Sequence, residues 1–218
     1  MEQQYCKPTF LNITAEKREK IIAVATHEFS ENGFENTNIN IIAKKAGVSV
    51  GSLYKYFDTK RDLFLTVVQV GISQLQQTLN PIYESDEPIL TKLESVLRSI
   101  QHTSRGSELI RLYGGISAQE NAGMSREIAR AMESVSAKVY TELICQGQAR
   151  GEIRSDIDAA MAAFMIDNIF MSLQFSYACD YYEERFRVYA GDNILNRDDY
   201  VVSQIITFVK SALKKQEE

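Results

Sequence analysis

The sequence predicts an all-α protein, and three observations lead to this fold class. Apolar residues recur at intervals of three and four along nearly every segment, no sustained alternation of the strand type occurs, and 218 residues include only three prolines. With 44% hydrophobic residues, the chain can bury a sizeable core, either as one globular protein or as two small domains.

Composition and cysteine usage favour a cytoplasmic protein. Three widely separated cysteines without a CxxC pair fit reduced thiols, and the first twelve residues lack the apolar core of a signal peptide. Residues 159–179 are long enough to span a membrane, but Asp167 near the middle would cost about 3 kcal/mol to insert. This segment is therefore expected to be a buried helix.

Basic residues gather in one short segment of an acidic chain. The net charge is −5, yet residues 37–61 carry five Lys or Arg against Asp58 alone, a local charge of +4. A basic patch of this kind fits a polyanionic partner held at one place, and the alternative is an ordinary solvated face.

The first long helix is expected to begin after Thr14, which is a suitable N-cap. Its apolar stripe contains Ile21, Ala25 and Phe29, each four residues apart, and it ends at Gly33, which can take a left-handed conformation.

Two short helices joined by a tight turn are expected next. Thr37 or Asn38 caps a helix that runs to Ala46, Gly47 breaks it, and Ser49 caps a third helix of two turns. On the third helix Leu53 and Phe57 point inward. The residues left for its outer surface are Gly51, Ser52, Tyr54, Lys55 and Tyr56.

This arrangement is typical of a helix-turn-helix, whose second helix can enter the major groove of DNA. An ordinary helical hairpin is the alternative. Two tyrosines and a lysine on so short a helix favour DNA, because they suit phosphate oxygens and sugar edges.

Residues 14–65 resemble the DNA-binding domain of the TetR family of bacterial transcription regulators. The motifs that carry the resemblance are FSENGF, a Thr before the second helix, IAKKAGVS across the turn, GSLYKYF on the third helix and TKRDLF at the start of the fourth. The resemblance implies a homodimer on a palindromic DNA operator. Such proteins usually repress transcription until a small molecule binds the second domain.

The resemblance also assigns DNA contacts by position. Ser49 to Ser52 are expected near base edges, and Lys60 is expected at a phosphate. Val50 is apolar where many relatives place a polar residue, so it is expected to pack on a thymine methyl, with part of the specificity read from DNA shape. The full set is Thr37, Asn38, Lys45, Ser49, Val50, Gly51, Ser52, Tyr54, Lys55, Tyr56 and Lys60.

The expected domains are a flexible arm over residues 1–12, a helix-turn-helix domain over 13–65 and a helical regulatory and dimerisation domain over 66–218. Pro81 and the YESDEP stretch at residues 83–88 are expected to end the fourth helix. The later helices are expected at 88–103, 105–120, 124–149, 156–183 and 198–214.

The last two long helices are apolar over a wide sector, which fits either a core of their own or a second subunit. The resemblance favours a four-helix bundle between two subunits. The residues expected at this dimer interface are Phe170, Val201, Ile205, Phe208 and Val209.

Aromatic and Met side chains of the second domain fit either a plain core or a pocket for a largely apolar effector. Polar groups amid an apolar helix favour the pocket, with an effector that brings a hydrogen-bond donor or a positive charge. The expected lining is Tyr113, Met132, Tyr140, Phe164, Asp167, Asn168, Met171 and Phe175.

No enzyme, catalytic residue, metal or cofactor is expected. His27 and His102 are the only histidines, and no metal-binding, nucleophile or phosphate-cradling motif occurs. The predicted function is a sequence-specific DNA-binding repressor released by a small molecule. The alternatives are an activator of the same fold, a helical adaptor whose hairpin binds protein, and a helical-bundle enzyme.

Overall fold

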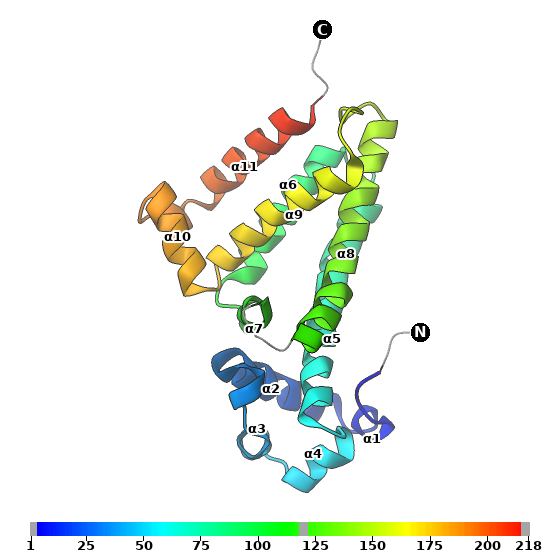
Figure 1. Ribbon diagram of the computed structural model, residues 1–218, viewed down its shortest axis with the longest axis vertical. Coiled ribbons are helices and arrows are strands. Elements are labelled where there is room, and N and C mark those ends of the chain that lie inside the picture. Colours follow the sequence, from blue (N-terminus) through cyan, green and yellow to red (C-terminus); the bar gives the residue numbers. More distant parts are fainter. Residues whose placement is uncertain (1–3, 118–121, 215–218) are drawn as a thin grey trace. The chain divides into compact units, whose positions relative to one another are not determined.

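The computed structural model describes residues 4–117 and 122–214, except for the side chains of residues 117 and 122–124, and it is all-α (Figure 1). Helices make up 81% of it, and no strand occurs among these residues. The predicted fold class is therefore confirmed.

The chain divides into two compact units. The N-terminal unit comprises Met1–Ser73 and Arg111–Ile128, and the C-terminal unit comprises Gln74–Ile110 and Ala129–Glu218. The boundary expected after residue 65 lies inside a helix that continues through it, so no break in the sequence marks the division.

The N-terminal unit is built around a helix-turn-helix. Its helices are α1 (Pro8–Leu11), α2 (Ala15–Asn36), α3 (Ile39–Ala46), α4 (Val50–Tyr56) and the first part of α5 (Lys60–Glu84). Two further helices, α7 (Glu108–Ser117) and α8 (Ala122–Ala149), belong partly to this unit and partly to the other.

Helix α2 forms as its sequence predicts. The Thr14 hydroxyl accepts the N–H of Lys17, and Ile21, Ala25 and Phe29 are buried. Gly33 has a φ of 69° and interrupts the helix near its end, which a residue with a Cβ would resist.

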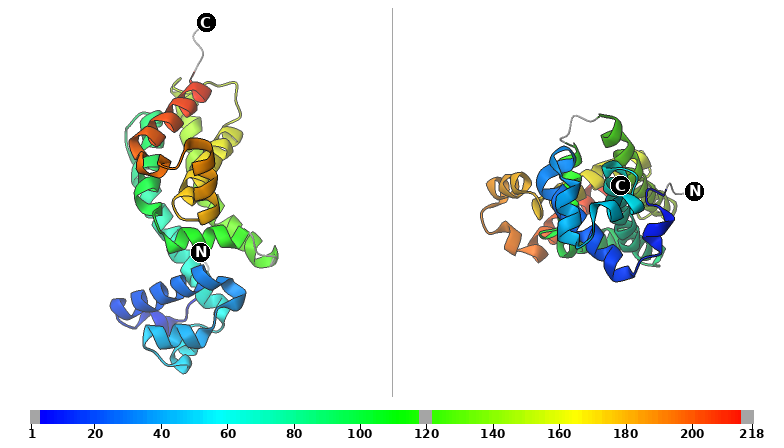
Figure 2. Two further views of the ribbon diagram at one scale, coloured as in Figure 1. Left: turned by 90° about the vertical axis from the view of Figure 1, so that its left-hand side faces the viewer. Right: turned by 90° about the horizontal axis from the view of Figure 1, so that it is seen from below.

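The C-terminal unit packs its helices around one apolar core. They are α6 (Ile89–Ser104), α9 (Ala159–Ser176), α10 (Asp180–Ala190), a 3-10 turn (Ile194–Asn196) and α11 (Asp198–Leu213). Helix α6 lies against both α9 and α11, and α10 lies against α9 (Figures 1 and 2). Gly147 of α8 lies so close to Ile153 that an added Cβ would be 2.6 Å from its Cδ1.

The prediction of a single helix over residues 156–183 is wrong, because α9 and α10 are separate helices. Asp158 caps α9 by accepting the N–H of Met161 at 2.9 Å. At the other end the Tyr177 carbonyl accepts the N–H of Gly106, and its hydroxyl donates to Asp198. These contacts with distant residues hold Tyr177 in a turn. The apolar sequence pattern continues through this turn, and it therefore suggested one uninterrupted helix.

Pro81 does not end α5, which continues to Glu84. Pro81 is exposed, and its missing N–H removes one hydrogen bond to the carbonyl of exposed Gln77, which water can reach. The helix ends instead within the YESDEP stretch at residues 83–88.

Part of the predicted flexible arm is ordered. Residues 8–11 form α1, and Phe10 is buried against Tyr56 and Phe57. The arm prediction does not hold for these residues, because one buried aromatic side chain offsets the entropy lost by ordering a short segment.

Among the described residues, α9 is the one helix that is long and apolar enough to cross a membrane, and 39% of it is buried. Length and composition alone are weak evidence, because the core helix of a globular protein passes the same test.

Candidate nucleic-acid interface

Helices α3 and α4 form the helix-turn-helix that the sequence predicts. The Asn38 side chain caps α3 by accepting the N–H of Asn40 at 2.9 Å. Gly47 ends the helix in the left-handed region, with φ 73° and ψ 32°, and the next N–H, that of Val48, donates to the Ala43 carbonyl. Gly47 thus sets the angle at which the chain enters α4.

Helix α4 begins with a serine cap. The Ser49 hydroxyl accepts the N–H of Ser52 at 3.0 Å, and the two hydroxyl oxygens are 2.8 Å apart. Leu53 and Phe57 are buried, as predicted. Ser49 and Ser52 therefore bond each other in this structure, and either hydroxyl can be the donor.

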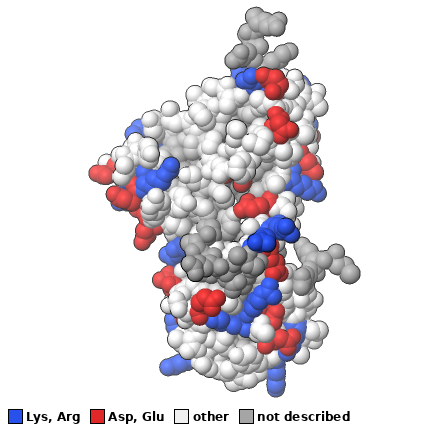
Figure 3. Space-filling model, in the orientation of Figure 1, with Lys and Arg blue, Asp and Glu red and all other residues white. Residues whose placement is uncertain are grey.

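The outer surface of α3 and α4 is basic and partly aromatic. Lys44, Gly51, Tyr54 and Lys55 are exposed, and Val50 and Ser52 are half-buried. In Figure 3, Lys and Arg side chains project from the lower edge of the N-terminal unit, where α3 and α4 lie in Figure 1. A positive surface of this shape suits the phosphates that flank a DNA groove.

Thr37, Tyr56 and Lys60 are three of the residues assigned to DNA whose side chains are engaged inside the protein. Thr37 is buried, and its hydroxyl donates to the Gly33 carbonyl at 2.6 Å. Tyr56 is 8% exposed because it packs on Phe10, which corrects its placement on the outer face. Its side chain and that of Thr37 are not presented to DNA.

The third is Lys60, whose ammonium group donates to the carbonyls of Glu35 and Thr37 at 3.0 and 3.2 Å. It also lies 4.7 Å from the ring centroid of Phe34. Lys60 therefore satisfies carbonyls at the end of α2, and a phosphate would have to compete with them. The DNA contacts of the exposed residues remain predictions.

Residues that sequence reasoning missed lie at the start of the chain. Lys7, Thr9 and Phe10 contact the C-terminal end of α4. The signal available in the sequence was Pro8 followed two residues later by an aromatic residue, which suits a short helical turn with one buried side chain.

In the C-terminal unit the predicted pocket residues are dispersed. Tyr140 is buried, and Asp167, Met132 and Met171 are half-buried. Phe164 and Asn168 are exposed, and Phe175 is buried and packs on Tyr182. Tyr113 belongs to the N-terminal unit.

The residues predicted for the dimer interface fall into a buried group and a more exposed group. Phe170, Val201 and Val209 lie in the core of their own unit, which corrects their assignment to an interface. Phe208 is 65% exposed, and Ile205 is half-buried. Helix α9 adds Met161, Phe164 and Met165, which the structure leaves exposed.

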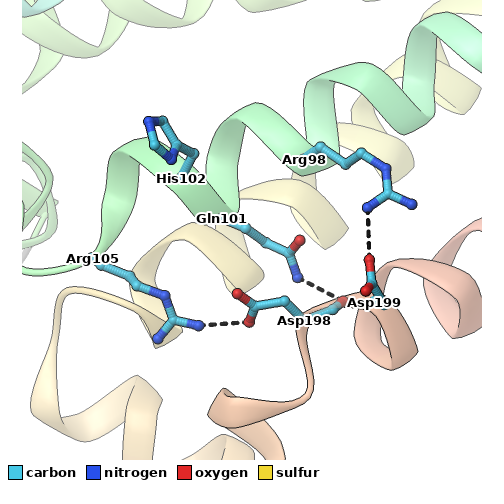
Figure 4. Close-up of a pocket in the computed structure, with 6 residues that line it drawn as sticks. All are labelled: Arg98, Gln101, His102, Arg105, Asp198 and Asp199. Carbon is cyan, nitrogen blue, oxygen red and sulfur yellow. Dashed lines mark hydrogen bonds and ion pairs between the residues drawn. The ribbon is translucent and has the colours of Figure 1, made fainter.

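A hollow of about 310 Å³ lies where α6 meets the start of α11 (Figure 4). Arg98 pairs with Asp199 at 2.9 Å, and Arg105 pairs with Asp198 at 2.5 Å. The remaining lining residues are Gln101 and His102. Because the charges neutralise one another, the hollow is better explained as ion pairs that hold α11 on α6 than as a ligand site.

Comparison with known proteins agrees with this architecture. The family model for bacterial regulatory proteins, tetR family, matches residues 21–67. An HTH-type transcriptional regulator of Staphylococcus aureus (strain bovine RF122 / ET3-1) is 25% identical over 170 residues, which cover 73% of this chain and 87% of that protein.

Solved structures share the fold. A TetR family transcriptional regulator from Chloroflexus aurantiacus has a TM-score of 0.69 and 25% identity, over 97% of this chain and 99% of that chain. FadR from Bacillus subtilis, in complex with stearoyl-CoA, has a TM-score of 0.68 and 18% identity, over 89% of this chain and 98% of that chain.

A helix-turn-helix with an exposed basic second helix, joined to a separate helical unit, defines a DNA-binding transcriptional regulator. Residues 21–67 match the TetR family model, and the chain is similar to a TetR family regulator of known structure over 97% of its length. Regulators of this family are soluble proteins that bind DNA and act as dimers. The relatives found are regulators of transcription.

Proposed function

We propose that the protein is a cytoplasmic, homodimeric repressor without enzymatic activity. It binds a palindromic operator through the outer face of α4 and leaves it when a small molecule binds the C-terminal unit. The exposed lysines and Tyr54 around α4 support the DNA-binding half of this proposal.

The observation that supports an effector site is a half-buried carboxylate close to a buried tyrosine in the C-terminal unit. Tyr140 of α8 is 3% exposed, and its ring meets Phe170 edge-on at 5.8 Å between centroids. Asp167 of α9 is half-buried, and burial raises its pKa to about 6. Within residues 4–117 and 122–214, no hydrogen bond reaches the Tyr140 hydroxyl or the Asp167 carboxylate.

These groups lie near one another. The charge of Asp167 adds to burial in raising the pKa of Tyr140, and burial followed by the charge of Asp167 raises the pKa of Glu133. Glu133 and Tyr140 are seven residues apart on α8, and therefore on one face of it. Two carboxyl groups and a hydroxyl thus converge between α8 and α9.

A bound molecule would pair with the Asp167 carboxylate. Because this carboxylate is partly desolvated, a hydrogen bond or ion pair to it is stronger than the same contact in water. The Asp167 carboxylate favours a donor or a positive charge, and the rings of Tyr140 and Phe170 favour an apolar body. The proposed effector is therefore a lipophilic molecule with an amine or another donor.

The protein is released from DNA if the effector binds more tightly to a protein conformation that has low affinity for DNA. Helix α8 runs from the core near Tyr140 to Glu127, which belongs to the N-terminal unit. There Glu127 accepts a hydrogen bond from Tyr5 at 3.0 Å and pairs with Arg61, at the start of α5. A shift of α8 would change these contacts, and only differential binding can drive it.

The experiment combines ligand binding and DNA release on the full-length protein. Thermal unfolding is measured with a panel of lipophilic amines and, because FadR binds stearoyl-CoA, acyl-CoA thioesters. Gel shifts then use a duplex that the protein selects from a random library. One lipophilic amine is expected to raise the melting temperature and to release the duplex.

Asp167→Asn should keep DNA affinity and lose the response to the amine. Asp192→Asn is the matched control, because Asp192 is exposed in the loop after α10. A response only to acyl-CoA would contradict the cationic effector. A reporter gene that loses expression when the protein is deleted would contradict repression.

A further inference from the structure

The C-terminal end of α4 is closed by residues from the start of the chain. Helix α4 has seven residues, and an isolated helix of two turns is not stable in water. The last carbonyls of a helix also lack partners within it. Here the N–H of Lys7 donates to the Tyr56 carbonyl at 2.8 Å.

The two preceding carbonyls are satisfied by the same segment. The Lys7 ammonium group donates to the Tyr54 carbonyl at 3.0 Å, and the Thr9 hydroxyl donates to the Lys55 carbonyl at 2.5 Å. Lys7 also pairs with Asp58 at 2.6 Å, just beyond the helix. Three consecutive carbonyls of α4 thus meet donors from residues 7–9.

An aromatic contact strengthens this closure. The ring of Phe10 lies 4.7 Å from that of Phe57 and 5.8 Å from that of Tyr56, measured between centroids. Phe10 is almost fully buried by these two rings and the core behind them. This packing also explains why Tyr56 turns away from the outer face of α4.

Helix α2 holds the segment from the other side. The Arg18 guanidinium donates to the carbonyls of Leu11 and Ile13 at 2.7 and 2.6 Å. Lys17 lies 5.9 Å from the ring centroid of Tyr56. The segment is therefore fixed both to α2 and to the helix it closes.

We propose that residues 7–10 brace the recognition helix, so that part of the operator specificity is set outside the helix-turn-helix. Base readout requires side chains such as Val50 and Ser52 to stay in place on α4. A frayed α4 would lose sequence-specific contacts while the lysines kept their general attraction for phosphates. The inference rests on DNA binding through α4.

The first test needs no DNA. Thr9→Val removes the hydroxyl donor and keeps the side-chain shape, and hydrogen–deuterium exchange reports the opening of α4. Losing one such hydrogen bond should speed exchange of the α4 amides about fivefold. Thr9→Ser, which keeps the hydroxyl, should restore slow exchange.

Thr78→Val is the matched control, because the Thr78 hydroxyl donates within α5 to the Gln74 carbonyl. It should leave α4 unchanged. Phe10→Ala removes the aromatic contact and should speed the same amides more strongly. Unchanged α4 exchange in both Thr9→Val and Phe10→Ala would overturn the brace.

The second test separates bracing from direct DNA contact. On the duplex selected by the wild-type protein, Thr9→Val should bind about fivefold more weakly, with unchanged affinity for a scrambled duplex and an unchanged salt slope. Lys7→Met should likewise keep the salt slope. A slope lower by about 0.9 for Lys7→Met would show a phosphate contact and overturn the purely bracing role.

These results distinguish the brace from the function on which it rests. If the wild-type protein selects no duplex, DNA reading through α4 is wrong even where Thr9→Val loosens the helix. If it selects a duplex that Thr9→Val binds equally well, the brace does not contribute to specificity.

Discussion

Glu28 is a carboxylate that the N-terminal unit keeps almost out of water. It is 5% exposed, and its Oε1 lies 2.5 Å from the ammonium group of Lys45 on α3. The pair joins α2 to the first helix of the helix-turn-helix. Lys45 is half-exposed, so water reaches only one side of the pair.

Lys45→Met should destabilise the N-terminal unit, because it leaves the Glu28 carboxylate buried without its partner. We expect the free energy of unfolding to fall by about 1–2 kcal/mol, measured by denaturant unfolding. Glu28→Gln added to Lys45→Met should recover most of this loss. A double variant no more stable than Lys45→Met would show that the charge is not the cause.

Asp167 should make stability depend on pH. Its folded pKa of about 6 lies above the ordinary value of 3.8, so the neutral acid favours the folded state. This contribution is fully present below about pH 4 and is lost as the pH rises through 6. After solvent screening the loss should be about 1–2 kcal/mol.

Unfolding curves between pH 4 and 8 test this prediction. Asp167→Asn should show a smaller decline over this range, with a remainder from Glu133, whose pKa is also raised by burial. Asp192→Asn, the exposed control, should follow the wild-type curve. Parallel curves for the wild type and Asp167→Asn would contradict the burial of this carboxylate.

At the level of elements, Gly47 fixes the turn between α3 and α4. Its left-handed conformation is unfavourable for residues with a Cβ, while an added Cβ would come no closer than 3.5 Å, to Lys20 Nζ. Gly47→Ala should therefore lower the stability of the N-terminal unit by about 1 kcal/mol through backbone strain alone.

Gly115→Ala is the contrasting change. Gly115 lies within α7, and an added Cβ would have no atom within 4 Å, so alanine should raise helix stability by about 0.5–1 kcal/mol. Calorimetry of the two variants should give melting temperatures shifted in opposite directions. Shifts of the same sign would show that backbone conformation does not decide the effect.

The elements of the helix-turn-helix were predictable because their determinants are local. Ser49 caps the helix that follows it, and Gly47 ends the helix before it. The break between α9 and α10 was not predictable, because Tyr177 is held by Gly106 and Asp198, which are distant in sequence. Its neighbours in sequence continue an apolar helical pattern.

The same distinction applies to the candidate site. A lysine at position 60 and a tyrosine at position 56 are suitable residue types for a DNA contact, and the resemblance to the family assigns that role by position. Their actual partners, the carbonyls of Glu35 and Thr37 for Lys60 and the ring of Phe10 for Tyr56, come from other segments of the chain. Asp167 was singled out by its apolar sequence neighbours, and the structure shows that it is partly buried.

For the whole molecule, the exposed apolar side chains of the C-terminal unit favour a second subunit. Phe164 on α9 is 62% exposed and Phe208 on α11 is 65% exposed, and Met161 and Met165 accompany Phe164. Apolar side chains grouped in this way are typical of interaction surfaces. A two-fold dimer would bury the same residues from both subunits.

Phe164→Asp combined with Phe208→Asp should therefore give a folded monomer, because both side chains are exposed in the single chain and both would become buried charges in a dimer. The two half-sites of a palindromic operator lie about 34 Å apart, and only a dimer occupies both at once. The monomer should bind the selected duplex at least about a hundredfold more weakly. Sedimentation at micromolar concentration measures the assembly, and gel shifts measure the binding.

Tyr189→Asp is the matched control, because Tyr189 is 80% exposed on α10. A dimer that survives the double change and dissociates with Tyr189→Asp would place the interface on α10 instead.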